Sequence, residues 1–355
     1  MIARVRLALP FVITIPKDEE LHAIEYEENG YRIKISPPYQ ANLSQEETQF
    51  ISPYSMRETL LKLSPVPQPT ILQTLTINGK LVYQANALEI VFQKDAFDRR
   101  RVLDRDDHDP KPEFIFKVAN SFLAKLRSIT QGSDVKLLGE QNALWRLEYL
   151  TDAQEELPHD PELFRATSGF GIHGSLTVVN KDIIEKVASL PQNYEMQTWE
   201  TLILDAEALL PDVRASLVLA FSALETLIAI ALDYFVTTTP TPPGLWKWVN
   251  KRDFWLKEPS VDEKYTVLLK ILTNRSLKDD PALWQSFVDL RKARNSIAHT
   301  GKPTLNRREI NPEQAGQLIG GAKNIINWIE QVLPEIMRRP IYATQTNINI
   351  VKPIA

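Results

Sequence analysis

Arginine, asparagine and histidine occur close together in RKARNSIAHTG, residues 291–301, a segment with helical spacing. Asn295 and His299 are four residues apart, so they lie one above the other on a helix, at the border of the sector that contains Arg294. Gly301 and Pro303 mark a helix end, where the dipole favours the imidazolium form of histidine. A histidine beside a guanidinium is suited to metal-independent proton transfer at a phosphodiester, because the guanidinium can hold the developing charge.

The arginines of this segment face its apolar side, which is an unusual place for a charge. Arg291 and Arg294 fall there, whereas Lys292 and Ser296 are expected on the solvated side. A guanidinium without a partner in apolar surroundings would cost several kcal/mol, so Arg294 requires a carboxylate, a subunit interface or an anionic ligand. Glu225 lies in the apolar run SALETLIAI and needs a cation for the same reason. We therefore expect Glu225 to form an ion pair with Arg291 or Arg294.

Basic residues concentrate around the same segment, although the whole chain has a formal net charge of −4. Between residues 275 and 308, eight basic side chains stand against three acidic ones, an excess of five positive charges. A chain without overall attraction to nucleic acid needs such a local patch to bind phosphates. We assign Arg291, Lys302 and Arg307 to substrate binding.

The elements that carry this segment are predicted to be helical. MQTWETLILDAEALL has helical spacing, and so does the apolar run after Pro211, a residue suited to a first helical turn. Further helices are expected at about residues 262–272, 281–299 and 312–337, after a loop with the sequence TTTPTPPG. These segments predict an all-α bundle over residues 195–340.

The first half of the chain is predicted to be β-rich. MIARVRLALPFVITIP reads as a strand, HAIEYEENGYRIKIS and LTINGKLVYQ read as hairpins around Asn-Gly, and ALWRLEYL and GSLTVVN supply further strands. An S-x-x-E capping box at Ser55 and Glu58 and an amphipathic helix from about Pro112 complete the pattern. We expect an α+β domain rich in antiparallel strands over residues 1–194, with a recognition or regulatory role. The alternating tail, residues 341–355, is expected to return to it as a strand.

The hexapeptide R-N-S-I-A-H, Arg294 to His299, resembles the R-x(4-6)-H signature of HEPN domains, which commonly have a polar residue after the arginine. The order of elements over about residues 196–340 is also similar, with a long apolar helix containing ALE, a variable loop, and the motif at a helix end before a final helix. The resemblance implies a homodimer formed through the bundle. It also implies an endoribonuclease without cofactor or metal, whose products are a 2′,3′-cyclic phosphate and a 5′-hydroxyl.

In such an enzyme His299 would transfer a proton, Arg294 would stabilise the phosphorane, and Asn295 would orient the reacting groups. Many members of the family act in phage defence or as toxins, so the resemblance also suggests an antiviral role and a regulatory partner. This chain departs from one group within the family. HEPN toxins paired with nucleotidyltransferase antitoxins often carry H-x-Tyr, whereas this chain has His299-Thr300-Gly301. The alternative function is a non-catalytic HEPN module that binds nucleotides or RNA and dimerises, with Arg294 and Glu225 holding the bundle together.

Composition restricts the compartment and the chemistry. The chain has 355 residues, 43% hydrophobic and 24% charged, which is ordinary for globular proteins and long enough for two domains. The lack of cysteine excludes disulfides, cysteine-bound zinc and a thiol nucleophile, and it fits a reducing cytoplasm. The longest apolar segment, Leu217 to Leu232, is shorter than a bilayer requires, so we expect a cytoplasmic protein without a membrane span.

Other suggestive patterns have simpler explanations. The G-x-G-x-x-G of SGFGIHG, residues 168–174, lacks a preceding strand and a following helix, so it predicts a glycine-rich turn. The acidic run LDRDDHDP, residues 103–110, lacks EF-hand spacing and predicts a solvated loop. Trp246 and Trp248 could stack on bases, but packing onto the bundle is the better interpretation.

Overall fold

The computed structural model divides the chain into two compact units, residues 1–195 with 342–355, and residues 196–341. It describes residues 2–41, 68–77, 79–95, 97, 109–139, 143, 145–150, 177–238, 246, 258–340 and 348–350. The first unit is rich in antiparallel strands and the second is mainly helical, as predicted from the sequence.

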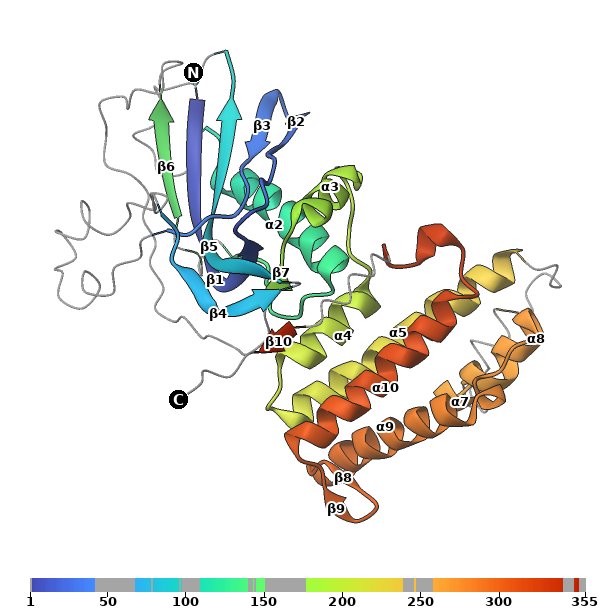
Figure 1. The fold of residues 1–355 in the computed structure, drawn as a ribbon. Helices are drawn as coiled ribbons and strands as arrows, with labels where there is room; N and C mark the ends of the chain where they lie inside the picture. The colour runs from blue at the N-terminus through green and yellow to red at the C-terminus, as the bar shows by residue number, and fades with distance from the viewer. Residues whose placement is uncertain are drawn as a thin grey trace. The chain divides into compact units, whose positions relative to one another are not determined.

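Eight of the described strands form one sheet in the first unit (Figure 1). Its longest members, β1 (Ile2–Pro16) and β5 (Lys80–Gln93), pair antiparallel with a register shift between Ala8 and Ile13. β1 pairs with a different neighbouring strand before and after this shift. β6 (Trp145–Leu150) pairs with the first half of β1, and β7 (Thr177–Val178) pairs with its second half in parallel.

The edges of this sheet are built from hairpins and from the tail. β2 (Ile24–Glu28) and β3 (Tyr31–Ile35) are joined by Asn29 and Gly30, whose φ values of 52° and 77° belong to the tight turn that Asn-Gly favours. The predicted hairpin around Gly79 is also present, between β4 (Ile71–Ile77) and β5. β10 (Ile348–Ile350) pairs antiparallel with β4.

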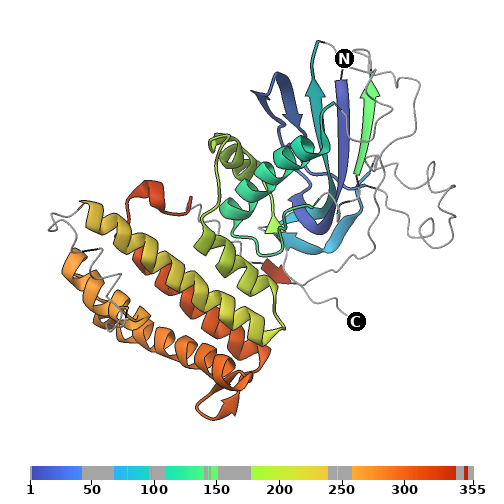
Figure 2. The same cartoon turned by 180° about the vertical axis from the view of Figure 1, so that it is seen from behind.

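Two helices cover one face of the sheet, as Figure 2 shows from behind. α2 (Pro112–Thr130) begins at the predicted proline, and α3 (Lys181–Ser189) follows β7. Buried side chains of α2 such as Phe122 and Leu126 share one core with alternate residues of β1. The capping box at Ser55 and Glu58 lies outside the described residues.

The second unit is a bundle of four longer helices with a smaller helical segment beside it (Figure 1). The bundle consists of α4 (Thr198–Ala208), α5 (Val213–Thr238), α9 (Pro281–Thr300) and α10 (Pro312–Glu330). The smaller segment consists of α7 (Val261–Glu263), the π-helical turn η3 (Lys264–Leu268) and α8 (Leu269–Thr273). Short elements between and after them are η4 (Leu277–Asp279), β8 (Thr304–Leu305), β9 (Arg308–Glu309) and η5 (Glu335–Met337).

Helix α5 is the most apolar element of the bundle. Among the described residues it is the one helix long and apolar enough to cross a membrane, with a mean hydropathy of 2.1 over its most apolar window. Because 56% of that window is buried inside the unit, α5 fits the core helix of a soluble protein. Its buried residues, such as Leu224, Leu227 and Ile228, belong to the core shared with α9 and α10.

Two helix ends differ from the sequence prediction. Pro211 precedes α5 instead of forming its first turn, because Asp212 caps the helix by accepting hydrogen bonds from the backbone of Arg214 and Ala215 at 3.2 and 3.3 Å. The last helix ends at Glu330 instead of Met337, and Pro334, which has no N–H to donate, precedes the short turn η5.

Adjacent glycines of α10 provide a test of how this helix packs on α9. A Cβ added to Gly320 would meet no atom within 4 Å, whereas one added to Gly321 would lie 3.0 Å from Cβ of Ser286 on α9. We expect Gly320→Ala to raise the free energy of unfolding by about 1 kcal/mol, since alanine is the better helix former. Gly321→Ala should be less stable than Gly320→Ala in urea unfolding. Equal stabilities would contradict this close packing.

Candidate functional site

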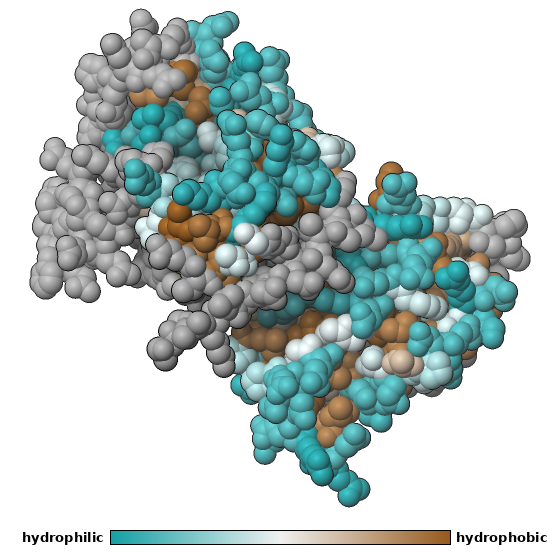
Figure 3. Space-filling view, in the orientation of Figure 1, coloured by the Kyte–Doolittle hydropathy of each residue, from teal (hydrophilic) through white to brown (hydrophobic). Residues whose placement is uncertain are grey.

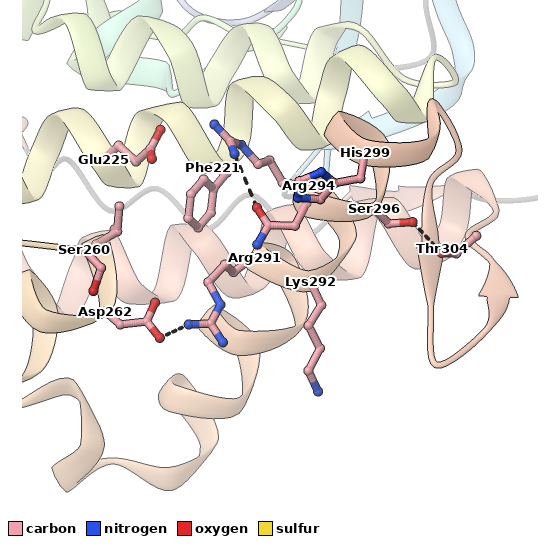
Figure 4. A pocket seen from close by; sticks show the side chains of 12 residues that line it. Phe221, Glu225, Ser260, Asp262, Arg291, Lys292, Arg294, Ser296, His299 and Thr304 are labelled. Atoms are coloured by element: carbon pink, nitrogen blue, oxygen red, sulfur yellow. Dashed lines mark hydrogen bonds and ion pairs between the residues drawn. The ribbon is translucent and has the colours of Figure 1, made fainter. Parts of the chain in front are cut away.

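An open hollow of about 730 Å³ lies in the second unit, along the C-terminal half of α9 (Figure 4). Three other elements contribute to it: α5, the start of α7 and the strand β8. The lining residues are Phe221, Glu225, Ser260, Val261, Asp262, Arg291, Lys292, Arg294, Asn295, Ser296, His299 and Thr304. All three residues that the sequence assigns to chemistry, Arg294, Asn295 and His299, therefore lie on one surface.

The side chain of Arg294 is half-buried, and no described carboxylate pairs with it. Among the described residues it forms no ion pair, and its Nη1 donates a long hydrogen bond of 3.3 Å to Oδ1 of Asn295. Its guanidinium carbon lies 5.6 Å from the centre of the Phe221 ring, a cation–π contact across to α5. This contact offsets part of the desolvation of the cation but leaves most of the guanidinium N–H donors unused.

The predicted ion pair of Glu225 with an arginine is wrong in this structure. Arg291 pairs instead with Asp262 in the first turn of α7, and no ion pair joins Glu225 to Arg291 or Arg294. The reason is positional, because α7 brings a second carboxylate to Arg291. Glu225 is half-buried and lines the hollow without an ion-pair partner among the described residues.

A buried tyrosine lies close to Glu225. Tyr265, in the π-helical turn η3, is fully buried and donates a hydrogen bond of 2.9 Å to the carbonyl of Leu224. Burial raises the pKa of Tyr265 well above its usual value, and the negative charge of Glu225 raises it further. Tyr265 is therefore a structural hydrogen-bond donor that holds η3 against α5, not a group that titrates.

His299 lies at the edge of the hollow, exposed to solvent, in the last turn of α9. The helix ends two residues later at Gly301, which has φ 70° and whose N–H bonds to the carbonyl of Ile297. In Figure 4 the side chain of Arg294 lies between those of Glu225 and His299. His299 is thus free to approach a ligand that contacts Arg294.

Ser296 and Lys292 also line the hollow. Lys292 is exposed, as expected for the solvated side of α9, whereas Ser296 is half-buried. Ser296 Oγ donates to the carbonyl of Lys302 at 2.9 Å and lies 2.6 Å from the hydroxyl of Thr304. Ser296 consequently anchors the chain that follows α9. Ser296 is half-buried instead of solvated because this part of the chain folds back against α9 as the short hairpin of β8 and β9.

The predicted basic tract is spread along α9 and beyond both of its ends, with Arg291, Lys292 and Arg294 in the hollow. Arg275 and Lys278 lie before the helix, and Lys278 is held 5.1 Å from the ring of Trp284. Arg291, the first residue of α9 that lines the hollow, lies about 15 Å along the helix from Pro281, so these two cations lie outside the hollow. Lys302 and Arg307 lie exposed beyond the other end, near His299 in sequence. The tip of the hairpin is hydrophilic in the space-filling view (Figure 3).

The hairpin tip has a backbone conformation that arginine rarely adopts. Asn306 and Arg307 have φ values of 52° and 65°, and glycine is the usual residue at the second of these positions. We expect Arg307→Gly to raise the free energy of unfolding by about 1 kcal/mol, because a left-handed conformation is unfavourable for a residue with a Cβ. Asn306→Gly should change it less, since asparagine tolerates this region. Urea unfolding of both variants measures the difference, and a less stable Arg307→Gly would contradict it.

The other sequence candidates that the structure describes do not contribute to the site. Trp246 packs against the bundle core and donates a hydrogen bond of 2.7 Å to Asp233, as predicted. Asp109 is bound by Tyr31 and by Lys94 instead of being solvated. Residues 103–108, the glycine-rich stretch 168–174 and Trp248 lie outside the described residues. Among the residues that were placed, no cluster of histidine and acidic side chains could hold a metal ion.

Apart from Glu225, the sequence prediction missed the lining residues that α9 does not carry. Phe221, Asp262 and Thr304 come from three separate elements, and nothing in their spacing connects them to the motif. One local signal was present, because Ser260 and Glu263 form a capping box that fixes the start of α7 beside Arg291.

Comparison with known proteins gives no family assignment. No protein-family model matches the chain, and no curated protein or solved structure is significantly similar to it.

Proposed function

We propose that the second unit is a HEPN-like endoribonuclease domain that cuts RNA at the hollow along α9. The observation that carries the proposal is Arg294, a half-buried guanidinium without a carboxylate partner among the described residues, in the same hollow as His299. Its preferred ligand is an oxyanion, because phosphate oxygens accept the forked N–H donors of arginine in pairs. The exposed cations Lys302 and Arg307 extend the attraction to neighbouring phosphates.

The reaction is a transesterification that requires no metal. The ribose 2′-oxygen attacks the adjacent phosphorus, the bond from phosphorus to the 5′-oxygen breaks, and a 2′,3′-cyclic phosphate and a 5′-hydroxyl result. Arg294 stabilises the charge on the phosphorane, and Asn295, hydrogen-bonded to that guanidinium, orients it. His299 either removes the 2′-hydroxyl proton or protonates the leaving oxygen.

One histidine cannot perform both proton transfers at the same moment. We therefore propose that two copies of the bundle form a homodimer in which their motif helices face each other and supply two His299 side chains to one phosphate. Two features support this arrangement: His299 is exposed, and the hollow is open. The proposed setting is the cytoplasm, in defence against phage or as a toxin, with the strand-rich unit as a recognition or regulatory domain.

The experiment is RNA cleavage in the presence of EDTA. Wild-type protein should cut transfer or messenger RNA to products with 2′,3′-cyclic phosphate ends, and His299→Ala should be slower by about 10²-fold to 10⁴-fold, the usual loss for a general acid or base. Arg275→Ala, a change of an exposed residue before α9, is the control. If wild type and His299→Ala are equally inactive on every RNA, the protein is instead a non-catalytic module for binding RNA or nucleotides.

A further inference from the structure

Glu225 is a carboxylate in a hollow that otherwise favours anions. It lies on α5, one helical turn after Phe221, and lines the same surface as Arg294 and Asn295. The other carboxylate of the hollow, Asp262, is neutralised by Arg291. The side chain of Glu225 has no hydrogen bond or ion pair within the described residues, although two arginines line the same hollow. The negative charge of Glu225 would repel a ligand that presents only phosphates to the hollow. A ligand that also carries hydrogen-bond donors would fit this site better.

The position of Glu225 separates it from the proton-transfer chemistry. Figure 4 places Glu225 beyond Arg294 on the side away from His299. A phosphate held between Arg294 and His299 would then lie on the opposite side of Arg294 from Glu225. The part of a nucleotide that lies farthest from its phosphate is the hydrogen-bonding edge of its base. A nucleotide whose phosphate contacts Arg294 can direct that edge toward Glu225.

We propose that Glu225 reads the base next to the bound phosphate and selects guanine. This inference rests on the RNA-binding function proposed above and names the substrate feature that the same hollow recognises. Unstacked bases in single-stranded RNA are commonly recognised on their Watson–Crick edges. Guanine presents two adjacent donors there, N1–H and the N2 amino group, which match the two oxygens of a carboxylate. Adenine and cytosine present one amino donor each, and uracil places carbonyl oxygens on both sides of its single N–H.

The test measures binding, so it does not depend on cleavage. Fluorescently labelled trinucleotides U-X-U, with 2′-O-methyl groups that prevent the reaction, are titrated against the full chain with X as guanine, inosine, adenine, cytosine or uracil. Guanine should bind more tightly than uracil by at least about tenfold, the discrimination of a two-bond contact to a base. Inosine, which lacks the N2 amino group, should be intermediate.

Glu225→Gln should reduce the preference for guanine to within about twofold while the uracil trinucleotide binds as well as before or better, because a repelling charge is removed. Glu309→Gln, the same change on the exposed strand β9, should leave the preference intact. Equal binding of all wild-type trinucleotides, or a guanine preference that survives Glu225→Gln, would overturn the base-reading role alone. If no trinucleotide binds and no RNA is cut, both the base-reading role and the proposed function as an endoribonuclease are wrong.

Discussion

Replacing Arg294 by alanine should slow RNA cleavage by about 10³-fold while leaving the stability of the helical unit almost unchanged, because a charge-stabilising arginine contributes mainly to the transition state. The stability expectation follows from the contacts of Arg294, which has one long hydrogen bond to its neighbour Asn295 and no ion pair with any described residue. Removing it leaves no carboxylate unpaired. Single-turnover cleavage assays measure the rate, and urea unfolding measures the stability.

Arg294→Lys is the informative companion variant. Lysine keeps the charge but cannot donate two parallel hydrogen bonds to a phosphate, so it should recover only a small part of the rate. A full recovery would mean that charge alone is sufficient at this position. If Arg294→Ala unfolds the protein instead, the guanidinium holds the bundle together and the argument for an anionic ligand fails.

The largest effect on stability is expected at the end of α10. Glu330 is 1% exposed and accepts hydrogen bonds from Arg339, whose side chain is 9% exposed, at 3.0 and 3.1 Å from Nε and 2.5 Å from Nη2. The Arg339 guanidinium also lies 5.5 Å from the centre of the Trp199 ring on α4. Arg339→Ala leaves the carboxylate buried without its cation, so it should lower the free energy of unfolding by about 3–5 kcal/mol.

A second ion pair of the same unit provides the control. Lys323 on α10 lies 2.6 Å from Glu207 on α4, but these side chains are 27% and 38% exposed. Lys323→Ala should therefore cost less than about 1 kcal/mol. Urea unfolding followed by far-ultraviolet circular dichroism at the helix minimum compares the variants. Similar losses in Arg339→Ala and Lys323→Ala would show that burial does not govern the strength of these pairs.

The elements predicted correctly are those fixed by local sequence. Asn29-Gly30 and Gly79 form the expected tight turns because these residues accept positive φ, and α9 ends at Gly301 for the same reason. The start of α10 was also predictable. Asn311 caps this helix by accepting a hydrogen bond from the backbone of Gln314, and Pro312 follows as the first helical residue. In each case neighbouring residues determine the conformation, so the sequence alone is sufficient.

The features that escaped prediction depend on contacts between distant segments. The partner of Arg291 is Asp262, which could not be chosen over Glu225 without knowing where α7 lies. The π-helical turn η3 is held by Tyr265 against the carbonyl of Leu224, a tertiary contact with no local signature. The hairpin of β8 and β9 lacks glycine at Arg307, so its turn was not recognisable.

The most direct measurement is a crystal structure of the protein with a short 2′-O-methyl RNA, which binds but cannot react. We expect a phosphate oxygen within hydrogen-bond distance of the Arg294 guanidinium, with the imidazole of His299 beside the same phosphate. An RNA bound on another surface, with Arg294 turned to Glu225 or to a second protein copy, would contradict the assignment of this hollow as the site of RNA cleavage.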